Sequence, residues 1–114
     1  MTEGIKTIIY PVKVIAKAKT LYSTLLDKEP YVDAPYYVGF KVGDQEIGLD
    51  PNGHKQGMTA PVGYYEVEDI KKSLRLLLDA GAQVQQDVRD VGGGKLIASV
   101  KDADENIIGL IQSP

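Results

Sequence analysis

The sequence of 114 residues contains no cysteine, no long apolar run and only one histidine. Without cysteine the chain has no disulfide framework, no thiolate metal site and no cysteine nucleophile. No apolar stretch approaches the ~20 residues that a membrane-spanning helix needs. Residues 1–14 also lack the apolar run of a signal peptide. We therefore expect a cytoplasmic protein with no membrane partner.

The charge balance excludes a second class of partner. The formal net charge is −3, whereas nucleic acids and anionic membranes favour proteins with clustered Lys and Arg. No nucleic-acid partner is expected, and the acidic balance is compatible with a cationic ligand. The length and a hydrophobic content of 43% are those of one compact domain with a real core.

Short segments that resemble functional motifs do so only superficially. His54 has no carboxylate beside it that would orient the imidazole, so we interpret it as a solvated loop residue. The glycines at 92–94 do not lead from a strand into a helix, as a phosphate loop does. Asp102, Asp104 and Glu105 lack the spacing of a calcium-binding EF-hand. With no nucleophile signature either, the motifs predict no catalytic residue.

The stretch Val62–Gly81 predicts a strand followed by an amphipathic helix. The strand ends at Val67, and Asp69 is a favourable helix N-cap. Apolar residues then recur at helical spacing, with basic residues on the opposite face. Gly81 stands where a left-handed residue is expected to end the helix.

A similar strand and helix are expected near the N-terminus. Ile5–Val12 is rich in β-branched residues and predicts a strand, and Ile15–Asp27 predicts a helix. Val14 stands at the N-cap, so this helix lacks the strong cap that Asp69 provides for the other. Its buried stripe is predicted to comprise Ile15, Ala18, Leu21, Tyr22, Leu25 and Leu26.

Two hairpins complete the pattern. Tyr36–Val42 and Gln45–Asp50 flank a Gly-Asp pair that suits a two-residue turn, and a loop or irregular edge is expected before them over Tyr31–Pro35. This turn places Val38, Phe40, Ile47 and Leu49 on an apolar face, and Tyr37, Gly39, Gly48, Asp50 and the Lys41–Glu46 pair on the other. After a strand expected over Gln83–Asp90, a second hairpin with a four-residue loop is predicted to pair Gly109 with Ala98, Ile107 with Val100 and Leu110 with Ile97.

The two halves of the chain repeat. Residues 7–21 align with residues 62–76 without a gap, and Ile47-Gly48-Leu49 aligns with Ile108-Gly109-Leu110. Each half reads as strand, helix and up to three strands. The sequence therefore predicts an α+β domain of two βαβββ modules, in residues 1–51 and 60–114, joined by the polar linker 52–59.

This organisation resembles the vicinal oxygen chelate superfamily, which contains glyoxalase I, extradiol dioxygenases and bleomycin-resistance proteins. The residues that carry the resemblance are Ala18 with Leu21-Tyr22, Leu25-Leu26, Val67-x-Asp69, Ala80-Gly81-Ala82 and Asp102-Ala103-Asp104. The resemblance implies curled sheets around a cup, with the helices outside. The competing interpretation is a ferredoxin-like fold, which lacks the extra hairpin in each half.

The resemblance also implies a metal site, whose ligands this sequence does not retain. Family enzymes hold a divalent metal with four residues, and the matching positions here are Thr7, Gly48, Val62 and Gly109. Metal-binding members have His, Glu or Gln there, because zinc and hard cations need imidazole or carboxylate donors. We therefore expect no metal, no cofactor and no metal-dependent glyoxalase or dioxygenase activity.

Small residues at the former metal positions would leave room for a guest in the implied cup. The predicted ligand-binding residues are Tyr37, Gly48, Asp50, Tyr64, Glu66 and Gly109, because tyrosines offer flat amphipathic surfaces and carboxylates attract a cation. A neighbouring side chain or subunit filling this space is the alternative. The whole predicted lining comprises Thr7, Ile9, Tyr37, Gly39, Gly48, Asp50, Val62, Tyr64, Glu66, Ala98, Val100, Gly109 and Ile111.

Three functions are compatible with these observations. The first is a metal-free small-molecule-binding protein of the bleomycin-resistance type, which sequesters an aromatic or cationic compound. The second is a lyase or isomerase that uses Glu66 or Asp50 as its base. The third is a structural or regulatory dimer with a vestigial cup.

We predict that the protein is a homodimer. Family members of this length commonly pair modules between subunits, and the linker Pro51–Ala60 is long enough to allow this. Light scattering at tens of micromolar should give twice the chain mass of 12.4 kDa. A monomer mass under those conditions would contradict the prediction.

Overall fold

The computed structural model describes all 114 residues and contains two βαβββ units, which confirms the predicted α+β fold class. Residues Lys6–Val62 form one compact unit, termed here the N-terminal module. Gly63–Pro114 form the other, the C-terminal module, and the first five residues, Met1–Ile5, belong to it as well. Neither helix combines the length and the apolar character needed to cross a membrane.

The N-terminal module builds its sheet in the order β2-β3-β4-β1. β1 runs parallel to β4, and the other neighbours are antiparallel. The predicted hairpin register is confirmed, with Val38 opposite Leu49 and Phe40 opposite Ile47. A short strand replaces part of the expected loop before the hairpin. The elements are β1 (Thr2–Pro11), α1 (Ile15–Leu26), β2 (Val32–Ala34), β3 (Tyr37–Val42) and β4 (Gln45–Asp50).

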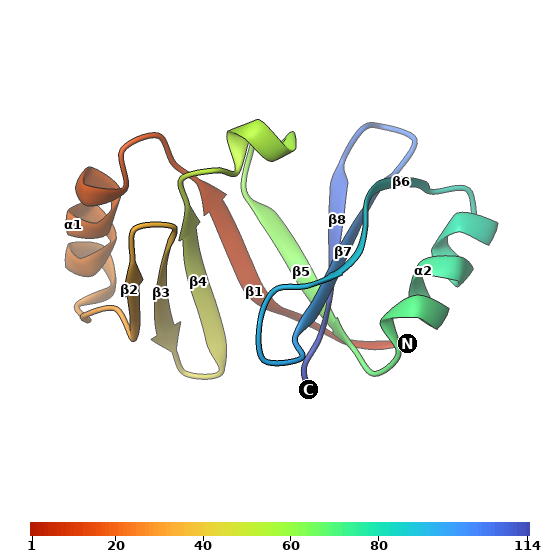
Figure 1. The fold of residues 1–114 in the computed structure, drawn as a ribbon, viewed down its shortest axis with the longest axis horizontal. Coiled ribbons are helices and arrows are strands. Elements are labelled where there is room, and N and C mark those ends of the chain that lie inside the picture. Colours follow the sequence, from red (N-terminus) through yellow and green to blue (C-terminus); the bar gives the residue numbers. More distant parts are fainter. The chain divides into compact units, whose positions relative to one another are not determined.

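The core of this module lies between the β3–β4 hairpin and α1, which is beside the sheet in Figure 1. Val38, Phe40 and Leu49 are buried there and pack against the α1 residues Ile15, Ala18, Tyr22 and Leu26. The predicted buried stripe of α1 wrongly included two exposed leucines. Leu21 and Leu25 are 65% and 71% exposed, because each lies one residue, or ~100° around the helix, from a packed position.

The C-terminal module repeats the arrangement, with the order β6-β7-β8-β5 and with β5 parallel to β8. Its core comprises Val67, Ile70, Leu74, Ala98, Val100 and Leu110, and α2 covers one face of the sheet. A single 3₁₀ turn, His54–Gln56, precedes β5, and His54 is exposed as predicted. The elements are β5 (Val62–Val67), α2 (Ile70–Asp79), β6 (Gln83–Asp90), β7 (Leu96–Lys101) and β8 (Ile107–Gln112).

The predicted register of the β7–β8 hairpin was wrong by one residue. Ser99 lies opposite Gly109, and Ala98 lies opposite Leu110. Because successive residues of a strand face opposite sides, this shift moves two predicted cup residues to the other face. Ala98 and Val100 belong to the core under α2 and not to the open side of the sheet.

The cause is the loop before β8, which includes Asn106 in addition to the four residues expected. The Asp102 carboxylate accepts the backbone N–H of Asn106 at 2.9 Å and that of Asp104 at 2.9 Å. Glu105 adopts a left-handed φ of 68°. The Asn106 side-chain amide also donates to Asp102 Oδ2 at 2.9 Å, and this hydrogen bond, followed by the backbone ones, lowers the pKa of Asp102. Together these hydrogen bonds hold an additional residue outside the ladder.

The N-cap positions of the two helices are equivalent, so substitutions at both can test how much a cap side chain stabilises each module. Asp69 accepts the backbone N–H of Lys72 at 3.1 Å, whereas Val14 has a similar extended backbone and no side-chain cap. Asp69→Ala should lower the free energy of unfolding by about 1 kcal/mol, and Val14→Asp should raise it by up to about 1 kcal/mol. Urea denaturation measures both. Unchanged stability in both variants would contradict this account of the caps.

Candidate functional site

The side chains of β3 and β4 that do not enter the core form the open face of the N-terminal module. Gly39 lies opposite Gly48 on this face, and Lys41 lies opposite Glu46. Tyr37 comes from the start of β3 and Tyr31 from the segment just before β2. We call Tyr31, Tyr37, Lys41 and Glu46 the tyrosine–glutamate cluster.

The ring of Tyr37 lies over the paired glycines. A Cβ atom at Gly39 would be 3.0 Å from Tyr37 Cε2, and one at Gly48 would be 2.2 Å from the Tyr37 Oη. Because neither glycine has a side chain, the tyrosine can cross both and reach Glu46. Its Oη donates a hydrogen bond to Glu46 Oε2 at 2.5 Å.

Tyr31 brings a second phenol to the same carboxylate. Its backbone N–H donates to the carbonyl oxygen of Gly39 at 2.9 Å, which fixes the ring beside the hairpin. Burial, followed by a hydrogen bond to Glu46 and by the charge of Glu46, raises the pKa of Tyr31. The Lys41 ammonium lies over the Tyr31 ring, 4.9 Å from the ring centroid, within the range of a cation–π contact.

The electrostatics keep both phenols protonated. Burial is the largest cause that raises the pKa of Tyr37, and the hydrogen bond and charge of Glu46 follow. The charge of Asp50 acts in the same direction. Both tyrosines are therefore hydrogen-bond donors at neutral pH, and they concentrate two O–H dipoles on one carboxylate.

Asp50 itself has a local structural partner. Its Oδ1 accepts the backbone N–H of Asn52 at 2.8 Å, which closes the turn after β4. The carboxylate is only partly buried. It therefore adds negative potential beside Tyr37 while it holds the end of the strand.

In the C-terminal module a different tyrosine covers the corresponding glycine. A Cβ atom at Gly109 would lie 2.5 Å from Cδ2 and 2.7 Å from Cγ of Tyr64, which is opposite Gly109 in the β5–β8 register. Glu66 accepts a hydrogen bond from the Ser113 hydroxyl at 2.7 Å. The hydroxyl of Ser99, a residue that is only 3% exposed, donates to the side-chain carbonyl of Gln85.

The six predicted binding residues thus fall into two groups, one in each module. In both groups a tyrosine ring occupies the space above a glycine, where a bound ligand was expected. The binding role of these residues stays a prediction. Sequence reasoning placed Glu46 on the right face but missed its role. It missed Tyr31 because that residue lies in a segment expected to be a loop or irregular edge.

The positions that hold the metal in the family do not fit a metal here. Gly48 and Gly109 lie under tyrosine rings, and Val62 is a buried aliphatic residue, 2% exposed. The Thr7 hydroxyl is the only side-chain oxygen among the four. No group of three or more His, Cys, Asp or Glu side chains is placed to hold a metal ion. Hard cations and zinc require such donors, so these four positions do not form a metal site.

No protein-family model and no curated protein sequence matches the chain. Solved structures do match it. An NAD-dependent benzaldehyde dehydrogenase from Legionella pneumophila is 18% identical, with a TM-score of 0.76 over 95% of this chain and 98% of that chain. A methylmalonyl-CoA epimerase from Mycobacterium tuberculosis is 16% identical, with a TM-score of 0.72 over 99% and 90% of the two chains.

A glyoxalase/bleomycin resistance protein/dioxygenase superfamily member from Vibrio splendidus 12B01 is 11% identical, with a TM-score of 0.71 over 94% of this chain and 97% of that chain. At such low sequence identity, the structural similarity shows a shared fold and nothing more. The chain has the fold of the glyoxalase and bleomycin-resistance superfamily, and the resemblance to vicinal oxygen chelate proteins is confirmed at that level. The extra hairpin in each module distinguishes it from a ferredoxin-like protein.

The tyrosine rings packed on Gly48 and Gly109 predict that a side chain at either position will destabilise the fold. Gly109→Ala should lower the free energy of unfolding by about 2 kcal/mol, because the new methyl group meets the inner ring atoms of Tyr64, which cannot swing away. Gly48→Ala should cost less, since its nearest contact is the outer Oη of Tyr37. Urea denaturation measures both losses.

A second variant supplies the control for this packing claim. In a Tyr64→Ala background, Gly109→Ala should be nearly neutral, which would give a clear coupling in the double-mutant cycle. An equal loss in both backgrounds would show that the ring of Tyr64 is not the obstacle.

Proposed function

We propose that the chain is a small-molecule-binding protein of the glyoxalase and bleomycin-resistance type that binds a cationic, aromatic compound without a metal. The proposed site is the tyrosine–glutamate cluster of the N-terminal module. The observation that carries the proposal is the convergence of Tyr31 and Tyr37 on Glu46, on the sheet face opposite α1.

The charge on this face favours a cation. Glu46 and Asp50 both act on Tyr37, whereas Lys41 is the one basic side chain of the cluster. Tyrosine rings add to the attraction, because the negative face of the π system binds ammonium and guanidinium groups. A flat aromatic part of the ligand would stack on the same rings.

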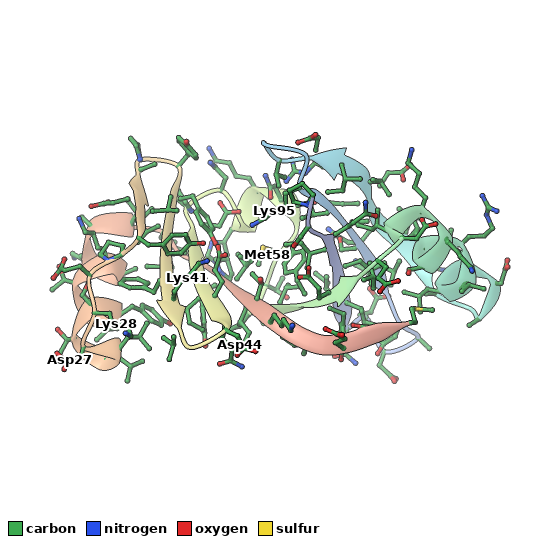
Figure 2. The ribbon with its side chains drawn as sticks, turned by 90° about the horizontal axis from the view of Figure 1, so that it is seen from below. Asp27, Lys28, Lys41, Asp44, Met58 and Lys95 are labelled. Atoms are coloured by element: carbon green, nitrogen blue, oxygen red, sulfur yellow. The ribbon has the colours of Figure 1, made fainter.

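The chain itself supplies an example of this chemistry. The Lys41 ammonium already lies against the Tyr31 ring, 4.9 Å from its centroid. Lys41 is exposed and is carried by a flexible stem, and Figure 2 labels it on the hairpin, together with Asp44 at the turn. A ligand cation would therefore replace Lys41 at the ring while the lysine moves into solvent.

This replacement predicts opposite effects for two variants. Benzyltrimethylammonium serves as the probe, and isothermal titration calorimetry measures its Kd. Glu46→Gln should weaken binding about tenfold, because the ligand cation loses a partly buried anionic partner. Lys41→Met should strengthen binding severalfold, because the internal competitor is removed while the stem is kept.

Asp44→Asn is the matched control. It removes one negative charge from the same hairpin, at the turn, where asparagine is well tolerated. Its Kd should stay within about twofold of that of the unmodified protein, because exposed charges are screened. An equal loss of affinity in Asp44→Asn and Glu46→Gln, or no saturable binding to the unmodified protein, would refute the proposed site.

A further inference from the structure

A second candidate site lies in the C-terminal module, in a groove of about 600 Å³ between α2 and β6. Its volume is within the range of small-molecule sites, which is ~300–1,000 Å³. The groove is on the helix-bearing side of its sheet, and none of the residues discussed above as binding residues lines it. Its properties are therefore independent of the proposed function.

One face of α2 forms the first wall. This face carries residues at the spacing that places them on the same side of a helix, namely Lys71, Leu74, Arg75 and Leu78. The prediction that the basic residues lie opposite the apolar face was therefore wrong for Lys71 and Arg75, which border it. Leu74 belongs to the core, but Leu78 is 37% exposed and presents apolar surface to the groove. Together with Val88 and Leu96 it makes an aliphatic lining with no aromatic side chain.

The second wall is an irregular part of β6. The pairing of β6 with β7 shifts between Gln86 and Arg89, so the strand bulges at residues 87–88. Bulges commonly redirect side chains beside binding sites. Here the irregular segment contributes Asp87, Val88 and Arg89 to the lining.

The groove contains more positive than negative charge, although the whole chain carries −3. Lys71 and Arg75 lie one helical turn apart, an arrangement of like charges that slightly destabilises a helix. Both carboxylates in the lining are engaged by backbone amides. Asp87 accepts the N–H of Val88 at 2.7 Å, and Asp90 accepts that of Gly92 at 2.7 Å.

We propose that this groove binds a small aliphatic carboxylate. Arg75 and Arg89 present planar guanidinium groups, which match a carboxylate with two parallel hydrogen bonds. The aliphatic chain of the ligand lies against Leu78, Val88 and Leu96. The absence of aromatic side chains from the lining favours a chain over a flat ring.

Three probes separate the contributions of charge and chain. Octanoate has both features, octanol has the chain alone, and acetate has the charge alone. Two-dimensional ¹⁵N–¹H spectra of the full chain should show saturable shifts with octanoate, concentrated in α2 and β6. Octanol and acetate should each bind at least about tenfold more weakly, since each lacks one class of contact. Equal binding of octanol and octanoate, or octanoate shifts concentrated on β3 and β4, would overturn the proposal.

A matched pair of variants tests the guanidinium. Arg75→Gln should raise the Kd of octanoate about tenfold, whereas Lys72→Gln should leave it unchanged, because Lys72 is exposed on α2 outside the groove. Both positions are exposed, so both variants should melt at nearly the same temperature as the unmodified protein. The same Kd in both variants would overturn the assignment of Arg75. Benzyltrimethylammonium binding should be unaffected by Arg75→Gln, which keeps this test distinct from that of the proposed function.

Discussion

The structure depends on two glycines in the middle of packed strands, Gly48 in β4 and Gly109 in β8. Each lies beside core residues on one side of its sheet, and a tyrosine ring lies against it on the other. A Cβ atom would lie 2.2 Å from the Tyr37 Oη at Gly48 and 2.5 Å from Tyr64 Cδ2 at Gly109. Because Gly48 and Gly109 have no side chain, a tyrosine ring can lie flat on the open face of each module. In the N-terminal module the lack of a side chain at Gly48 also allows the phenol of Tyr37 to cross the hairpin and reach Glu46.

The two modules meet this constraint with residues from different strands. In the β1–β4 register Ile9 lies opposite Gly48, and in the β5–β8 register Tyr64 lies opposite Gly109, so Ile9 and Tyr64 are equivalent. The N-terminal module has an isoleucine there, and its glycine is covered by Tyr37 of β3 together with Ile9. The C-terminal module uses the equivalent residue, Tyr64, directly. In the N-terminal module this solution brings the phenol of Tyr37 to the carboxylate of Glu46, so the two modules satisfy the same constraint with tyrosines from different strands.

Local chemistry explains which parts of the fold could be predicted from the sequence. The Gly43-Asp44 turn specified the register of β3 and β4, and Asp69 specified the start of α2, because each depends on a few adjacent residues. The β7–β8 register was missed because Asp102 holds Asn106 in the loop through side-chain hydrogen bonds that no spacing rule reveals.

At the candidate site, the alternation of side chains along each strand correctly placed Tyr37 and Glu46 on one face. The contribution of Tyr31 depends on tertiary folding of an irregular segment, and helical spacing alone did not separate Leu21 from the packed stripe.

The unequal caps of the two helices have a consequence for local unfolding. α1 begins at an uncapped valine and has no fully buried side chain, whereas α2 begins at a capping aspartate and buries Ile70, Ser73 and Leu74. Local opening of a protein starts where contacts and caps are fewest, so α1 opens before α2. When it opens, Val38, Phe40 and Leu49 lose their cover, while the hairpin that carries Tyr37 and Glu46 keeps its own ladder of backbone hydrogen bonds. Tyr37, Lys41 and Glu46 of the tyrosine–glutamate cluster therefore lie on the part of the module that keeps its backbone hydrogen bonds when the helix frays, whereas Tyr31 lies in the segment that follows α1.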